Sequence, residues 1–259
     1  GLAPVYAQYL PTRGDPVYAA KREDQILLMR GLFMTSFLAD DFLADQEYRG
    51  ARSVLISSAS SKTSIALAFQ VKQTGRARAI GLTAPRNIAF VRALGFYDQV
   101  SSYDEIASLA VEPAVFVDMA GDGAVTAAVH RHFGDALHYD CSIGATHWSA
   151  AREDARFPGP KPEFFFAPAQ IVKRSKDWGA QVLSQCLAAA WTKFCDASDT
   201  WLKVVRGSGR EALERVYQDT LAGRTEADWE PLRQRFLREM VLPRIPNAAR
   251  RLVQDHQDA

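Results

Sequence analysis

Ser53-Val-Leu-Ile-Ser-Ser-Ala-Ser-Ser-Lys-Thr-Ser64 is the stretch of sequence that decides the fold. A short apolar run is followed by small hydroxyl residues, and then by apolar residues at helical spacing up to Thr74, with Gly75 placed to end the helix. This order predicts a buried strand, a tight turn and a helix, which together make one unit of an α/β fold.

The same alternation of strand and helix continues through residue 143. A helix is expected over residues 23–44, with Gly31 as a point where it could kink. Further strands are expected over residues 53–58, 77–82, 99–101, 114–118 and 136–143, and further helices over residues 61–74, 85–94, 103–109 and 124–133. Short links between alternating elements favour parallel pairing, so we predict a Rossmann-like, doubly wound parallel sheet covered on both faces.

The remainder of the chain is predicted to be mainly helical. Residues 164–166 are an aromatic strand candidate, after which helices are expected over residues 169–205, 211–221 and 226–241, with breaks near residues 179 and 196–199. We therefore expect three regions. These are an N-terminal arm and helix (1–50), a dinucleotide-binding domain (51–168) and a helical C-terminal extension (169–259).

Composition and charge exclude several classes of protein. The 259 residues are 47% hydrophobic, with 31 Lys and Arg against 30 Asp and Glu, which excludes a disordered or collagen-like chain and gives no global attraction to nucleic acid. No apolar run reaches the roughly 20 residues that cross a bilayer, and the first residues lack the order of a signal peptide. We expect a soluble, cytoplasmic protein without a nucleic-acid or membrane partner.

The three cysteines, Cys141, Cys186 and Cys195, indicate neither a disulfide framework nor a metal site. Their number is odd and no CxxC spacing occurs, so we expect three buried thiols and no metal. GxSxG, HExxH and GxxxxGK[ST] are also absent, which removes the usual support for hydrolase, zincin and P-loop readings.

The turn after the first expected strand is the first candidate binding site. Ligands of open parallel sheets bind beyond the carboxyl ends of the strands, where dinucleotide folds normally carry GxGxxG. Small residues still permit close approach here, and hydroxyl groups could donate to phosphate oxygens beside a helix N-terminus. The candidate phosphate ligands are Ser58, Ser60, Ser61, Lys62, Thr63 and Ser64. The alternative is that these residues are ordinary helix caps.

The second expected strand ends without the carboxylate that would bind an adenosine ribose. Thr83 and Arg86 stand there instead, and a guanidinium suits a 2′-phosphate, so a bound dinucleotide would be NADP(H) rather than NAD(H). Lys62 could serve the same phosphate. Arg86 could equally be an exposed residue in the first turn of a helix.

The later strand ends offer one acidic and one basic candidate. Asp118 could contact a ribose or take part in catalysis, although Asp-x-x-Gly is also common turn chemistry. Ile143 and Gly144 begin a loop that carries His147 beside Trp148, and His147 is the best placed of the five histidines for proton transfer. A structural role for this histidine stays open.

Several motifs resemble the cofactor domain of the medium-chain dehydrogenase/reductase superfamily. They are GLFMTSF at 31–37, SIALAFQVKQTG at 64–75 and NIAFVRALGFYDQVSSYDEI at 87–106. TSFLADDFL at 35–43, SSASSKTS at 57–64 and FFFAPAQIVKRSKDWG at 164–179 resemble, more narrowly, an uncharacterised domain-of-unknown-function branch related to the zinc-independent, quinone-oxidoreductase-like members. The resemblance covers roughly residues 1–205.

The resemblance implies NADP(H)-linked hydride transfer to a carbonyl, enone or quinone. It places the glycine loop at residues 58–64, the 2′-phosphate site at Thr83 and Arg86, the nicotinamide-side threonine at Thr35, and the loop beside the nicotinamide at residues 143–147. The chain departs from the superfamily because the glycines are replaced, the catalytic zinc cysteines are not identifiable, and the barrel-like N-terminal domain is absent or truncated.

We therefore expect a zinc-independent, NADP(H)-dependent oxidoreductase with a small-molecule substrate, in which Thr35 and His147 position the carboxamide or the substrate. One alternative is a non-catalytic binding or scaffold protein, which the altered loop favours. Another is an S-adenosylmethionine-dependent methyltransferase, against which Thr83 and Arg86 argue. In these reductases the strand at residues 164–166 often pairs with its twin, which implies a homodimer through the edge at Phe164–Phe166. Burial of this edge within the monomer is the other reading.

Overall fold

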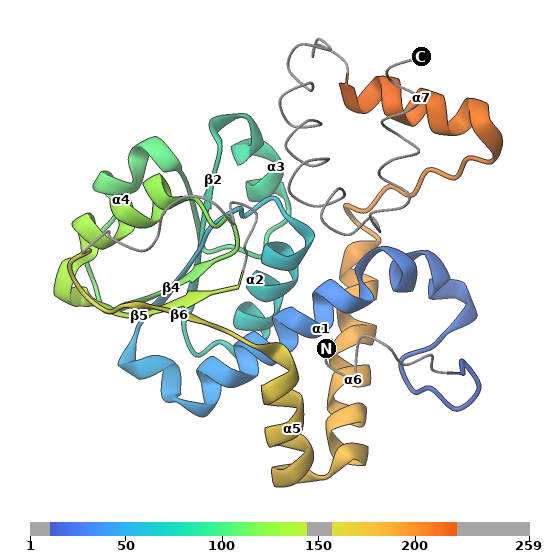
Figure 1. The fold of residues 1–259 in the computed structure, drawn as a ribbon, viewed down its shortest axis with the longest axis horizontal. Helices are drawn as coiled ribbons and strands as arrows, with labels where there is room; N and C mark the ends of the chain where they lie inside the picture. The colour runs from blue at the N-terminus through green and yellow to red at the C-terminus, as the bar shows by residue number, and fades with distance from the viewer. Residues whose placement is uncertain (1–10, 144–156, 222–259) are drawn as a thin grey trace, which may run out of the picture. The chain divides into compact units, whose positions relative to one another are not determined.

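The computed structural model describes residues 11–143 and 157–221 (Figure 1). The chain forms two compact units, Gly1–Lys203 and Val204–Ala259. The first unit contains the sheet and six helices of the described part. They are α1 (Glu23–Asp45), α2 (Lys62–Thr74), α3 (Ile88–Ala93), α4 (Gly123–Phe133), α5 (Ala167–Trp178) and α6 (Ala180–Ser198). In the second unit the described helix is α7 (Gly209–Leu221).

A six-stranded sheet, parallel throughout, forms the centre of the first unit. The strands are β1 (Ser53–Ile56), β2 (Arg78–Thr83), β3 (Gln99–Ser102), β4 (Ala114–Asp118), β5 (Leu137–Ser142) and β6 (Pro162–Phe164), and their spatial order is β3-β2-β1-β4-β5-β6. This is the strand order of doubly wound dinucleotide-binding sheets, which confirms the predicted Rossmann-like fold. The order reverses between β1 and β4, so the crevice for a ligand is expected at the carboxyl ends of these two strands.

Apolar side chains of the strands alternate between two cores, one on each face of the sheet. Val54 and Ile56 of β1 belong to the core under α1, α2 and α6, while Leu55 belongs to the core under α4. Successive side chains of a strand point to opposite faces, so a strand buried on both faces needs an apolar residue at every position. Figure 1 shows α2 on one side of the sheet and α4 on the other.

Helix α1 forms a second layer over α2. Ser64–Val71 of α2 are buried without interruption, because the sheet covers one side of this helix and α1 and α6 cover the other. An aromatic cluster joins the helices, with the ring of Phe33 centred 5.2 Å from Trp191 and 5.0 Å from Phe194. Phe69 of α2 completes the cluster at 5.3 Å from Phe194. Residues 64–71 of α2 are thus held in a fully packed environment.

The structure differs from the sequence-based expectations in several details. Helix α1 runs through Gly31 without interruption, because Met29 and Phe33 on either side of it are anchored in the core. Strand β6 lies at Pro162–Phe164, two residues before its expected start. The expectation of three buried cysteines is wrong for Cys186, which is exposed on α6, while Cys141 and Cys195 are buried. The helix expected at 226–241 lies outside the described residues.

None of the helices in residues 11–143 and 157–221 combines the length and the apolar character that a membrane span requires.

Candidate functional site

The turn between β1 and α2 is tight, and its conformation explains why glycines commonly stand here. Ser58 has a φ of 51°, in the left-handed region that residues other than glycine and asparagine rarely adopt. Its backbone carbonyl accepts from Ser61 N at 2.7 Å, which closes the turn. Ser64, in the first turn of α2, is completely buried and donates from Oγ to the Ser57 carbonyl at 2.8 Å. Ser58 therefore occupies a glycine-type position of this turn, while the hydroxyl groups of Ser61 and Ser64 form hydrogen bonds within it.

Two neighbouring side chains hold this turn against the sheet. Tyr97 donates from its hydroxyl to the Ala59 carbonyl at 2.8 Å, and its ring packs over Gly81 of β2. A Cβ at Gly81 would lie 2.8 Å from the Tyr97 ring, so only glycine fits at this position. The hydroxyl of Tyr103 accepts from Ser58 N at 3.0 Å. These contacts position the turn without using the first amide groups of α2.

The N-terminus of α2 opens beyond the carboxyl end of β1. Ser61 is the N-cap, and its side chain accepts from Ser64 N at 3.2 Å. The backbone N–H groups of Lys62 and Thr63 have no acceptor among the described residues, and the Lys62 side chain is exposed. Unpaired amide donors at a helix N-terminus, together with the helix dipole, favour an anion.

Helix α1 meets this first turn through a residue that the sequence did not single out. Ser36 donates from Oγ to the Thr63 carbonyl at 2.7 Å. The adjacent Thr35 is half-buried and donates from its hydroxyl to the Gly31 carbonyl at 3.1 Å. Thr35 therefore lies within one residue of a direct contact between α1 and the α2 N-terminus, and its oxygen retains the capacity to accept a hydrogen bond.

The end of β2 carries the expected basic residue beside the turn. Thr83 is buried, whereas Arg86 is exposed in the short 3-10 helix η4 (Pro85–Asn87). The next residue, Asn87, donates from Nδ2 to Ser60 Oγ at 3.0 Å, so the β2–α3 connection is fixed to the β1–α2 turn. Arg86 is thus adjacent in sequence to a residue that touches the candidate phosphate turn.

Asp118 at the end of β4 belongs to an internal hydrogen-bond network. Its carboxylate accepts from Ser57 Oγ at 2.9 Å and from the amides of Ala120 and Gly121 at 3.0 and 2.9 Å. Ser57 Oγ in turn accepts from Met119 N at 2.8 Å. With 1% of its surface exposed, Asp118 joins the ends of β1 and β4 across the switch point.

The expected loop after β5 is only partly described. Ile143 donates its backbone N–H to the Asp118 carbonyl at 2.9 Å, which attaches the start of this loop to the end of β4. Gly144 and His147 lie outside the described residues. Among the described residues, no group of three or more His, Cys, Asp or Glu side chains is arranged to hold a metal ion.

The residues at this edge have the chemistry that phosphate groups require. Two amide donors and Lys62 stand at the α2 N-terminus, Arg86 follows the end of β2, and the described ends of β1 and β2 offer no exposed carboxylate that would repel phosphate. The sequence indicated the hydroxyl turn and Arg86, but it did not indicate Ser36, Asn87 or Tyr103. Their contacts join residues 27 to 45 positions apart, which local spacing does not encode.

Comparison with known proteins gives one family match. Residues 1–226 match a family described as "Protein of unknown function (DUF2855)". No curated protein matches the chain significantly.

Several solved structures match part of the chain at low identity. A putative NADPH:quinone reductase from Mesorhizobium loti is 14% identical, with a TM-score of 0.46, over 67% of this chain and 50% of that protein. The yhdH oxidoreductase from Salmonella enterica in complex with NADP is 15% identical, with a TM-score of 0.39, over 63% and 49%. A thermostable alcohol dehydrogenase from Pyrobaculum aerophilum is 14% identical, with a TM-score of 0.44, over 81% and 57%. The matched region spans about half the length of these proteins.

Proposed function

The chain belongs to the DUF2855 family of proteins of unknown function, and within that family we propose that it is an NADP(H)-dependent oxidoreductase of the medium-chain type, acting without zinc on a carbonyl, enone or quinone. The observation that carries this proposal is the α2 N-terminus at the switch point of the sheet. There the backbone N–H groups of Lys62 and Thr63 have no acceptor among the described residues. They follow Ser58, whose backbone adopts the left-handed conformation.

Each part of the coenzyme has a candidate partner in this chain. The α2 N-terminus and Lys62 would bind the diphosphate, and Arg86 would bind the 2′-phosphate. Thr35 would accept a hydrogen bond from the carboxamide, because its own hydroxyl proton is directed to Gly31. The coenzyme would supply the hydride, so the chain itself needs to bind, orient and exclude water. His147 remains the proposed residue for contact with the substrate.

Asp118 takes a positioning role in this proposal. Its carboxylate is committed to Ser57 and to the backbone of the β4–α4 turn, so it fixes the distance between the two strand ends between which the diphosphate would lie. An Asp118→Asn variant keeps an acceptor but loses the charge, and is expected to lower NADPH affinity through the turn rather than by a direct contact.

Calorimetric titration with NADPH and NADH tests the proposal. We expect NADPH to bind more tightly than NADH, and Arg86→Ala to weaken NADPH binding by about tenfold, the loss expected for a charge-assisted hydrogen bond. NADH binding should change little. Arg92→Ala is the matched control, because Arg92 lies on α3 and donates to the Val100 carbonyl away from the turn. Failure of both coenzymes to bind would overturn the proposal.

A non-catalytic binding or scaffold protein is the second candidate, and one observation favours it. The hydroxyl groups of Ser61, Ser64 and Tyr103 form hydrogen bonds within the turn, and the Ser57 hydroxyl donates to Asp118. A turn satisfied in this way needs no ligand to be stable. The titration above separates the two candidates, since a scaffold protein would bind neither coenzyme.

We also propose a homodimer formed through strand β6. All three residues of β6 are exposed, and Phe164 and Phe166 retain 68% and 46% of their surface while the intervening Phe165 packs against Phe42. In the described part of the chain β6 is an edge strand of the sheet, and an exposed edge with two aromatic side chains is suited to pairing with a second copy. Analytical ultracentrifugation should show a dimer that Phe164→Lys converts to a monomer. A wild-type monomer would contradict this.

A further inference from the structure

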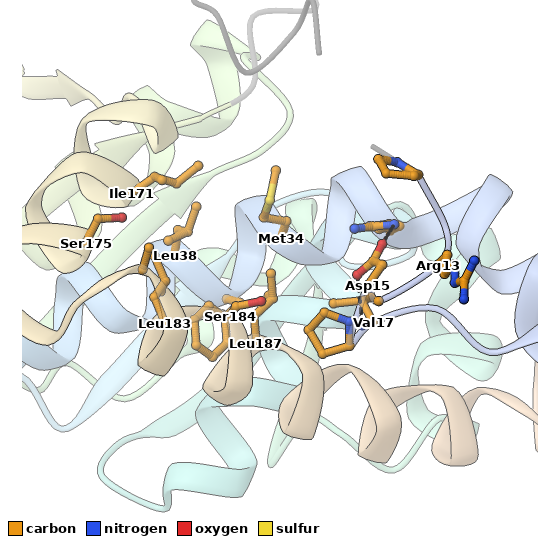
Figure 2. Close-up of a pocket in the computed structure, with 16 residues that line it drawn as sticks. Arg13, Asp15, Val17, Met34, Leu38, Ile171, Ser175, Leu183, Ser184 and Leu187 are labelled. Carbon is orange, nitrogen blue, oxygen red and sulfur yellow. Dashed lines mark hydrogen bonds and ion pairs between the residues drawn. The ribbon is translucent and has the colours of Figure 1, made fainter. Parts of the chain in front are cut away.

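A cavity of about 480 Å³ lies between the N-terminal arm and helices α1, α5 and α6 (Figure 2). Its walls are mainly apolar. Met34 and Leu38 of α1 lie on one side, Leu183 and Leu187 of α6 lie on the other, and Ile171 of α5 lies at one end. This volume and lining are typical of pockets that bind small molecules.

The arm that forms the opposite end of the cavity is held by specific contacts. Asp15, with 9% of its side chain exposed, pairs with Arg30 of α1 at 2.7 Å. Its other carboxylate oxygen accepts from Val17 N at 3.0 Å, and the Val17 side chain is buried. At the end of the arm, Arg22 pairs with Asp196 of α6 at 2.6 Å. These contacts make this end of the cavity part of the fold rather than a gap beside a loose segment.

Charge is distributed unevenly along the cavity. Asp15 is the one acidic residue of the described lining, and both of its carboxylate oxygens are used by Arg30 and by the backbone of Val17. Arg13 lines the same end and has no acidic partner among the described residues. Among the described lining residues, Arg13, Arg30 and Asp15 therefore give the arm end one positive charge in excess, whereas Ser175 lines the α5 end with an uncharged hydroxyl. Figure 2 shows Arg13 and Ile171 at opposite ends of the lining.

We propose that this cavity binds an amphipathic small molecule with one unbranched apolar chain and an anionic head group, the chemistry of a medium-chain carboxylate. The apolar chain would lie between α1 and α6, where burial of methylene groups drives binding. The carboxylate would lie at the arm end beside Arg13, which supplies the charge that the apolar walls lack.

The proposed cavity site and the N-terminus of α2 lie against different sides of α1. Residues of a helix are 100° apart, so Met34 and Leu38 project from α1 on the side opposite to Ser36, which contacts α2. The inference therefore does not depend on the proposed reductase activity, and either can fail while the other holds.

Calorimetric titration of the full chain with decanoate and with 1-decanol tests the proposal. We expect saturable one-to-one binding of decanoate and weaker binding of 1-decanol, which has the same chain length without the charge. Arg13→Gln should lower decanoate affinity roughly two- to fivefold, as for an exposed ion pair, and should leave 1-decanol binding unchanged.

Two adjacent polar residues of α6 provide a matched pair of tryptophan variants. Ser184 lines the cavity, whereas Gln185 is exposed and does not line it. Ser184→Trp should occupy the space for the chain and weaken decanoate binding about tenfold or more, while Gln185→Trp should bind as the wild type does. Far-UV circular dichroism and Tm verify that both variants fold.

Four results would overturn the proposal in whole or in part. The first is absence of decanoate binding to the wild type, and the second is equal binding by the two tryptophan variants. The third is decanoate binding that appears only after residues 1–10 are removed, which would make the chain's own N-terminal segment the occupant. Equal affinities for decanoate and 1-decanol, unaffected by Arg13→Gln, would overturn the anionic head group.

Discussion

Asp40 is a carboxyl group buried in α1 at an energetic cost. It retains 5% of its surface and accepts from the Tyr48 hydroxyl at 2.6 Å. Burial raises the pKa of Asp40 to about 6, although the hydrogen bond from Tyr48 acts in the opposite direction. The neutral form is thus favoured in the folded protein, so ionisation of Asp40 destabilises the fold as the pH rises from about 4 to 6.

Asp40→Asn should remove this destabilisation. The amide keeps an acceptor for Tyr48 without the charge, so we expect the variant to be more stable than the wild type by about 1–3 kcal/mol at pH 8, with the difference vanishing near pH 4. Urea unfolding at both pH values measures it. Glu47→Gln removes the same charge from an exposed neighbour and serves as the control. A variant less stable than the wild type at pH 8 would contradict the expectation.

His130 presents the related case of a buried base. Its Nε2 lies 2.7 Å from Asp140 Oδ2 and its Nδ1 lies 2.8 Å from the Pro158 carbonyl, so a doubly protonated ring donates to both. Burial lowers the pKa of His130, but the hydrogen bonds to Asp140 and Pro158, together with the Asp140 charge, raise it by more, so the net shift is upward.

A raised histidine pKa stabilises the fold at low pH. The contribution of His130 should be fully present below its unfolded value of 6.5 and should be lost as the pH rises through the higher folded value. His130→Gln should therefore lower the free energy of unfolding, measured in urea at pH 6, by about 1–3 kcal/mol relative to the wild type. This difference in stability should become smaller toward pH 9. A gap independent of pH would show that His130 acts through packing alone.

At the residue scale, the sequence was informative where a side chain acts on its own neighbours. Ser61 was recognisable as a helix cap and Asp118 as a turn residue, because both roles depend on spacing within a few positions. The pairing of Asp40 with Tyr48, of His130 with Asp140 and of Ser58 with Tyr103 depends on how separate elements pack. Those partners were therefore not predictable from spacing alone.

At the element scale, α2 depends on its cap for both stability and the proposed binding. Ser61→Ala should destabilise the fold by about 0.5–2 kcal/mol, because Ser64 N loses its acceptor. Ser61→Asp should retain that stability, since aspartate caps as well as serine does, yet it should weaken NADPH binding by charge repulsion. Thermal unfolding and coenzyme titration of both variants make the comparison. Equal NADPH affinity for wild type and Ser61→Asp would argue against phosphate at this terminus.

Element boundaries followed the sequence closely where the local pattern was strong and less well where tertiary contacts decide. Strand β4 was predicted to the residue, because its apolar run is bounded clearly. Strand β6 was predicted to begin two residues too late. The prediction followed the aromatic run at 164–166, of which only the first residue belongs to the strand, and whose side chains alternate between solvent and the core. The helix expected at 103–109 is the 3-10 helix η5 (Tyr103–Ser108), a distinction that apolar spacing does not make.

At the scale of the whole molecule, the parallel sheet was predictable because alternating strands and helices with short links leave few topologies. The division of the chain after Lys203 was not predictable, because the sequence of α6 and of the residues that follow it indicates one helical region. The described cavity was also beyond the sequence, because residues from the arm and three helices line it.

The two compact units lead to a prediction about truncation. A chain ending at Lys203 contains the sheet, both cores and helices α1–α6, so it should unfold in one cooperative transition. We expect its Tm to lie within about 2–4 °C of the full chain, which corresponds to a change of about 1 kcal/mol. Differential scanning calorimetry measures this. A much larger fall would show that residues 204–259 stabilise the first unit.

The enclosure of α2 has a consequence for motion. A helix with no side open to solvent over eight residues cannot unwind by itself, so its amide hydrogens exchange only when α1 separates from the layer beneath it. The same helix begins where the coenzyme phosphates are proposed to sit. A ligand bound there would contact one of the most rigid parts of the molecule. The conformational changes that admit and release a substrate would therefore have to occur in segments other than α2.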